Sequence, residues 1–125
     1  SRTFENLKQA FLEEASLAQR YAYFAVIADF EGSDRFSQLF KEFARSGEVN
    51  SGGCLDFLRS GRELGGTRKN LQSVLQTESE HSNELYANMA RIAREEGFTD
   101  AASWFDTLEK LKRSRLARIK KVSDE

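Results

Sequence analysis

Five ionisable side chains of this sequence have the types and spacing that metal or proton chemistry requires. They are Glu14, the pair Glu78 and His81, and the pair Lys112 and Arg115. The members of each pair are three residues apart, so both lie on one face if the segment is helical. Carboxylates and imidazole are donors for iron, manganese or zinc, whereas carboxylates beside cations form ion pairs. A metal ion close to the two cations would be opposed by Coulomb repulsion.

Long helices are expected to position these residues. The chain has no proline, and its apolar residues recur at steps of three and four, which is typical of amphipathic helices. Thr3 and Ser33 are expected to cap the first two helices. Glycines predict turns after the first and third helices and a linker over residues 61–67. The expected helices cover residues 3–30, 34–60, 68–96 and 100–122.

A weak internal repeat favours two packed helical hairpins. The segment 27–32 is echoed by 92–97, and Leu39 and Phe40 match Trp104 and Phe105 at the same spacing of 65 residues. Two such hairpins packed together make a four-helix bundle. The length of 125 residues suits one domain and not two. The sequence therefore predicts a single all-α domain over residues 1–125.

The faces that point toward the bundle axis, called the inner faces below, are apolar at both ends and polar in the middle. The interruptions are Glu14, then Gly47 and Asn50, then Glu78 and His81, then Lys112 and Arg115. An unpaired charge in such a core costs several kcal/mol, so these groups need each other, a metal or water. The alternative is that the long side chains reach the rim and the inner faces are displaced by one position.

Composition excludes several classes of partner. The chain has 19 basic and 20 acidic residues, which argues against nucleic acid or an anionic membrane as an obligate partner. No apolar run approaches the roughly 20 residues that cross a bilayer, and no secretory signal is visible. The single cysteine, Cys54, excludes an internal disulfide and a multi-cysteine metal site. A reducing, cytoplasmic setting is the expectation.

The sequence resembles the rubrerythrin family, ferritin-like proteins that reduce peroxide at a di-iron centre. The resemblance covers nearly the whole chain and is clearest in three segments, which are 7–11 with Glu14, 20–24, and 91–98. It implies a ferritin-like four-helix bundle. The family's metal site takes a Glu from helix 1, Glu-x-x-His from helix 2, Glu-x-x-Glu from helix 3 and Glu-x-x-His from helix 4.

Counted from the glycines of the two turns, most of these implied ligands are replaced in this chain. Helix 1 keeps its glutamate. Helix 2 loses both ligands, helix 3 keeps one of two, and helix 4 carries two cations. The corresponding positions are Glu14, Gly47, Asn50, Glu78, His81, Lys112 and Arg115. Tyr21 and Tyr86 match tyrosines near the family's metals, and the four cysteines of a rubredoxin module are absent.

The replacement predicts a network of Glu, His, Lys and Arg in place of the metals, with no cofactor and no peroxide chemistry. Lys112 and Arg115 balance Glu14 and Glu78 in charge if His81 is neutral. The function would then be that of a non-catalytic binding or assembly protein. Two alternatives stay open. Glu14, Glu78 and His81 could hold a single iron, manganese or zinc ion for oxidoreductase chemistry, or the vacated cavity could bind a small molecule.

Three further residue types each allow more than one interpretation. Glycines at positions 47, 52 and 53 cost about 1 kcal/mol each in a helix, and they indicate close helix contact, a local helix break, or a small pocket. Cys54 is interpreted as an inert core thiol rather than a nucleophile, because no base is placed for it. His81 is expected to be a hydrogen-bond partner of Glu14 or Glu78 rather than an acid–base group.

The linker limits how the bundle closes. Helices of about 25 residues span ~37 Å, whereas seven linker residues reach about 25 Å. The chain then forms either an up-down-up-down bundle or a homodimer in which the first hairpin of one copy packs on the second hairpin of its partner. The resemblance favours the swapped homodimer.

Overall fold

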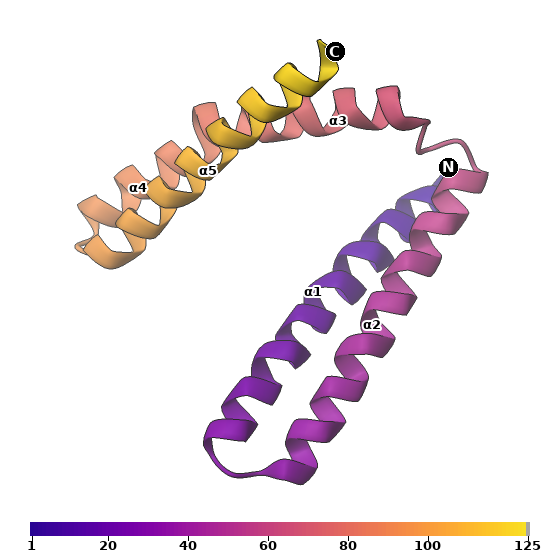
Figure 1. Cartoon of the computed structure of the whole chain (residues 1–125), viewed down its shortest axis with the longest axis vertical. Helices are drawn as coiled ribbons and strands as arrows, with labels where there is room; N and C mark the ends of the chain where they lie inside the picture. The colour runs from indigo at the N-terminus through magenta and orange to yellow at the C-terminus, as the bar shows by residue number, and fades with distance from the viewer. Residues whose placement is uncertain (125) are drawn as a thin grey trace. The chain divides into compact units, whose positions relative to one another are not determined.

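The chain is all-α and has the ferritin-like class of fold (Figure 1). The structure is a computed structural model that describes residues 1–124. Helices α1 (Arg2–Phe30) and α2 (Asp34–Ser60) form one compact unit, hairpin 1. Hairpin 2 contains α3 (Thr67–Glu80), the π-helical segment η1 (His81–Leu85), α4 (Tyr86–Glu95) and α5 (Thr99–Ser123). None of the helices in residues 1–124 is both long and apolar enough to cross a bilayer.

The helix starts differ from the sequence-based expectations. Ser1, not Thr3, caps α1, and its hydroxyl accepts a hydrogen bond from the Phe4 N–H at 3.3 Å. Ser33 does occupy the N-cap position of α2, but its side chain makes no capping hydrogen bond. The expectation for α1 is wrong because Ser1 and Thr3 are equally able to accept from a free N–H, whereas the expected N-cap position of α2 is confirmed.

The two turns are built alike. Gly32 and Gly97 have φ of +73° and +84°, a left-handed conformation that glycine adopts without steric cost. In each turn the residue after the glycine donates back across the helix end, from Ser33 to Ala28 and from Phe98 to Ala93, both at 2.8 Å. This pattern closes a helix with a glycine just after its end. Each hairpin therefore reverses over a few residues and brings its two helices side by side.

Small residues allow the helices within each hairpin to approach closely. The buried residues are mostly alanines, with Ser37, Gly47, Ser51 and the larger Leu58 in hairpin 1 and Ser82 in hairpin 2. Larger inner-face side chains stay accessible, since Phe36 is 60% and Phe57 is 66% exposed. Each hairpin taken alone thus buries mostly small residues and leaves much of its inner face uncovered.

The hairpin tips are equivalent at a spacing of 65 residues. One groove lies at the turn of hairpin 1, and it is lined by Phe24, Ile27, Ala28, Glu31, Ser33, Phe36 and Phe40. A second groove lies at the turn of hairpin 2, and it is lined by Met89, Ile92, Ala93, Glu96, Phe98, Ala101 and Phe105. Every lining position of the first groove corresponds to one of the second. The weak repeat in the sequence is therefore a repeat of tertiary structure.

Candidate functional site

In hairpin 2, Glu78 of α3 is bound by two cations of α5. Lys112 Nζ donates to Glu78 Oε1 at 3.0 Å, and Arg115 Nη1 donates to the same oxygen at 3.2 Å. The side chains of Lys112 and Glu78 are only 17% and 13% exposed, whereas that of Arg115 is 65% exposed. The Glu78–Lys112 pair is therefore shielded from water, and Arg115 joins it from the solvent side.

The charges of this cluster decide the ionisation of Glu78. Burial raises the pKa of Glu78, but the hydrogen bonds and positive charges of Lys112 and Arg115 outweigh burial and hold this pKa below its ordinary value of 4.5. Glu78 is therefore a carboxylate at neutral pH. One of its oxygens already accepts two charge-assisted hydrogen bonds, which are stronger than neutral ones.

His81 lies at the start of η1, three residues after Glu78. Its ring packs against Tyr86, with centroids 5.4 Å apart, and Tyr86 stacks on Phe105 at 6.5 Å. His81 Nδ1 and Glu78 Oε2 are buried and have no hydrogen-bond partner among the described residues. Within hairpin 2, Glu78 does not satisfy His81 Nδ1 as expected. The alternative that Glu14 is the hydrogen-bond partner of His81 stays a prediction.

The π-helical segment η1 was not anticipated, although the repeat contains a signal for it. Residues before η1 match hairpin 1 at a spacing of 64, as Glu14 matches Glu78, whereas residues after it match at 65, as Tyr21 matches Tyr86. A π-helical turn accommodates one extra residue within a continuous helix. The predicted helix over 68–96 therefore contains a one-residue insertion, located between Glu78 and Tyr86.

In hairpin 1 the corresponding positions hold a weaker polar contact. Asn50 Nδ2 donates to Glu14 Oε1 at 3.4 Å, a long hydrogen bond. Glu14 is half-buried and Asn50 is exposed. Nothing in this pair resembles the doubly bound carboxylate of hairpin 2.

Gly47 has a packing role. A Cβ added there would lie 2.8 Å from the Cβ of Ala18, closer than two non-bonded carbon atoms normally approach. The alternative of a helix break is wrong, since α2 runs from Asp34 to Ser60 without interruption. Gly52 and Gly53 differ from Gly47, because an added Cβ would meet no atom within 4 Å. Close helix contact therefore accounts for one of these three glycines.

The other residues singled out from the sequence lie among aromatic and small neighbours. The ring of Tyr21 lies 6.1 Å from Phe40 and 5.4 Å from Phe43, and these rings belong to the inner face of hairpin 1. Cys54 is a half-buried free thiol. Its interpretation as an inert core thiol stays a prediction.

These residues do not fit a dinuclear carboxylate centre. Lys112 and Arg115 donate to Glu78 where that centre needs electron-pair donors, and Gly47 offers no side chain and packs on Ala18. Among residues 1–124 no three His, Cys, Asp or Glu side chains gather as metal ligands would. The structure brings Glu78, Lys112 and Arg115 together, and separately Glu14 with Asn50.

The chain resembles known rubrerythrins along its length. The rubrerythrin family profile matches residues 5–111. Rubrerythrin-1 of Clostridium acetobutylicum is 30% identical over 84% of this chain and 61% of its own length. Rubrerythrin of Porphyromonas gingivalis is 30% identical over 99% of this chain and 69% of its own length. The first of these matches thus spans less than two thirds of the relative. Together they establish that this chain belongs to the rubrerythrin family.

Proposed function

We propose that this chain is a rubrerythrin-type scaffold in which an ion-pair cluster takes the place of the dinuclear metal centre, and that it acts by binding or assembly rather than by peroxide reduction. The observation that carries the proposal is the pair of hydrogen bonds from Lys112 and Arg115 to Glu78 Oε1, at 3.0 and 3.2 Å. A metal ion at Glu78 would have to displace both cations or lie beside them.

The electrostatics support this assignment. At ~4 Å two unit charges repel by about 4 kcal/mol at an effective dielectric of ~20. A divalent ion beside Lys112 and Arg115 meets this repulsion from both, with twice the charge. The cations also satisfy one oxygen of the shielded Glu78, so the carboxylate needs no metal for charge balance. The cluster of Glu78, Lys112 and Arg115 has one excess positive charge. In hairpin 1 the position that matches Glu78 holds Glu14, which has a single negative charge.

The test is metal loading of the native chain against a restored variant. The restored variant carries Asn50→His, His81→Glu, Lys112→Glu and Arg115→His, which rebuilds the family's ligand pattern except at Gly47, where an added side chain would meet Ala18. After incubation with ferrous iron and desalting, we expect the restored variant to retain iron and the native chain to retain none. Retention of two iron ions per native chain, lost in Glu78→Gln, would refute the proposal.

A second function is favoured by the two unpartnered atoms. Glu78 Oε2 and His81 Nδ1 are buried without hydrogen-bond partners, an arrangement that a single bound metal ion would satisfy. With Glu14 as third ligand, such a site would support oxidoreductase chemistry at one iron, manganese or zinc ion. Calorimetric titration with each metal distinguishes the two functions, since only this one predicts one equivalent bound and its loss in His81→Ala.

We also expect the functional form to be a homodimer in which hairpin 1 of one copy packs on hairpin 2 of its partner. The uncovered inner faces support this homodimer. The charges of the polar clusters support it as well, because pairing hairpin 1 with hairpin 2 brings together one negative and one positive cluster, whereas pairing two like hairpins brings together clusters of the same sign. Sedimentation equilibrium measures this directly. A folded monomer at all concentrations would contradict the homodimer without affecting the metal test.

A further inference from the structure

A groove in hairpin 2 combines an apolar floor with two cations. It lies between α3 and the last turns of α5 (Figure 1) and has a volume of about 390 Å³. Its lining consists of Leu71 from α3 and of Arg115, Arg118, Ile119 and Val122 from α5. Small-molecule sites in proteins have volumes of roughly 300–1,000 Å³ and join apolar walls to a few polar groups. The groove therefore has the size and the lining of a site for a small ligand.

The two guanidinium groups of the groove have free hydrogen-bond donors. Arg118 is exposed and has no hydrogen-bond or ion-pair partner within residues 1–124. Arg115 uses only Nη1 in its hydrogen bond to Glu78, and its side chain is 65% exposed. A guanidinium has five N–H donors and binds a carboxylate through two parallel hydrogen bonds. The two arginines are three residues apart on α5, so both lie on one face of the helix.

The charge of the groove differs from that of the whole chain. The chain has 19 basic and 20 acidic residues, so it has no general attraction for anions. The groove has two cations, and among the described residues that line it none is acidic. A positive potential confined to one concave site selects anionic ligands.

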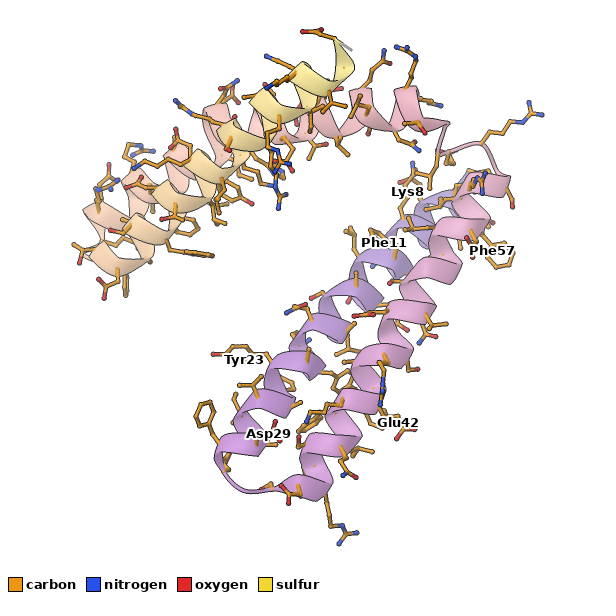
Figure 2. All side chains as sticks on the ribbon, in the orientation of Figure 1. Lys8, Phe11, Tyr23, Asp29, Glu42 and Phe57 are labelled. Atoms are coloured by element: carbon orange, nitrogen blue, oxygen red, sulfur yellow. The ribbon has the colours of Figure 1, made fainter. Side chains whose placement is uncertain are left out.

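Hairpin 1 shows that helix pairing does not require these cations. At the spacing of 65 residues, Arg115 and Arg118 correspond to the uncharged Asn50 and Gly53 of α2. Figure 2 shows Phe57, which corresponds to the last lining residue of the groove, projecting from α2 at the end of hairpin 1 away from its turn. An apolar residue is thus present at this position in both hairpins, whereas the two cations are particular to hairpin 2.

We infer that this groove binds a small amphipathic carboxylate, of the class of medium-chain fatty acids. The carboxylate binds to Arg115 and Arg118, and the alkyl chain covers the apolar floor. Leu71 and Ile119 are half-buried and Val122 is 66% exposed, so a bound chain removes apolar surface of all three from water. An inorganic anion would leave this floor uncovered, and an alkyl cation would meet two positive charges. The groove therefore selects both parts of the ligand.

This inference goes beyond the proposed function, which concerns the ion-pair cluster. Glu78 and His81 do not line the groove, so binding of a carboxylate does not depend on whether the chain binds a metal. The groove includes part of the inner face of hairpin 2, which the proposed homodimer covers. If the homodimer closes the groove, the native chain will not bind alkyl carboxylates, and that result would overturn the inference.

The first test is calorimetric titration of the native chain with hexanoate, octanoate and decanoate below the concentrations at which they form micelles. The Kd is expected to fall about tenfold for each two added carbon atoms, because each buried CH₂ group strengthens binding. Octylamine, which is a cation at neutral pH, is expected to bind at least about tenfold more weakly than octanoate. An affinity that does not rise with chain length, or octylamine that binds as tightly as octanoate, would overturn the inference.

The second test removes one cation from the groove. Arg118→Gln is expected to weaken octanoate binding at least about tenfold, because hydrogen bonds from a charged donor are lost. The fold is expected to be unchanged, since Arg118 is exposed and has no partner to lose within residues 1–124, and circular dichroism checks the helix content. The matched control is Lys120→Gln, which removes the same charge from an exposed residue of α5 outside the groove.

The control variant is expected to bind octanoate as the native chain does. Equal affinities in Arg118→Gln and Lys120→Gln would overturn the inference. Val122→Glu gives a second reading at an exposed position, because it adds a carboxylate to the groove. This variant is expected to abolish octanoate binding, and unchanged binding in it would also overturn the inference.

Discussion

Hairpin 1 and hairpin 2 share one backbone plan at their tips and differ in the middle. At the tips the turns, the grooves and the ring stacking of Tyr21 on Phe40 and of Tyr86 on Phe105 recur. Even the tip ion pair recurs with its charges exchanged, as Lys41 with Asp29 in hairpin 1 and as Arg94 with Asp106 in hairpin 2. The pairing of opposite charges is kept between the two tips, while the residue types are not.

In the middle of each hairpin, the equivalent contact between the two helices is made by different side chains. Hairpin 1 brings α1 and α2 together by removing a side chain, so that Gly47 packs on Ala18. Hairpin 2 fills the equivalent position with Lys112 and binds it to Glu78. The one-residue insertion at η1 lies beside this second arrangement. Close packing therefore brings the helices of hairpin 1 together at this position, and a shielded ion pair joins those of hairpin 2.

The largest effect is expected from filling the close contact of hairpin 1. Gly47→Leu forces a side chain into the space of Ala18, and overpacking of this kind costs about 3 kcal/mol. Gly52→Leu, in the same helix with no atom within 4 Å of an added Cβ, is expected to be neutral or stabilising. Urea unfolding at fixed protein concentration measures both. Equal losses in the two variants would contradict the packing role of Gly47.

Removing the shielded cation of hairpin 2 is expected to cost somewhat less. Lys112→Met leaves Glu78 with Arg115 alone, and breaking a largely buried ion pair that keeps a second partner costs about 2 kcal/mol. The control is Lys110→Met, because Lys110 is exposed on the same helix and a surface charge contributes little. If Lys112→Met is as stable as Lys110→Met, the ion pair does not hold hairpin 2 together.

Acidification is expected to remove the stabilisation that the cluster gives. The pKa of Glu78 is lower in the folded chain than its ordinary value of 4.5, so its contribution is present above pH 4.5 and is lost as pH falls through the folded pKa. The difference in free energy of unfolding between the native chain and Glu78→Gln should therefore be largest near neutral pH and should disappear at acidic pH. A difference that grows on acidification would mean that the Glu78 carboxylate is not stabilised by its cations.

The smallest effect is expected from exchanging the tip ion pair. The variant Asp29→Arg, Ser37→Ala, Lys41→Asp gives hairpin 1 the charges of hairpin 2, where Ala102 stands in place of Ser37. Since both side chains of the native pair are half exposed, the unfolding midpoint is expected to stay unchanged. A large loss would indicate that the Ser37–Asp29 hydrogen bond, rather than the charge pair, holds the tip.

Much of the fold could be read from residue spacing. The absence of proline, the turn glycines and the repeat were sufficient for four helical segments and two hairpins, because helix formation depends on neighbours three and four residues away. The middle of the inner faces could also be located, since charges in apolar patterns are visible in the sequence. The first helix caps were misjudged, because Ser1 and Thr3 are equally suited to cap by type.

The arrangement within the site depended on tertiary structure. From the sequence alone Glu78, Lys112 and Arg115 were placed at one level of a helical protein, and the replacement of most of the family's ligands is predicted from the same positions. Only the folded hairpin decided that both cations bind the same oxygen of Glu78, that His81 Nδ1 is left without a partner, and that Gly47 is held against Ala18. The physical reason is that local spacing and the distance between helices depend on different parts of the chain. Spacing along a helix fixes which face a side chain occupies, whereas a distance of 3 Å between two helices depends on how closely the backbones pack, and that is set by all the small residues between them at once.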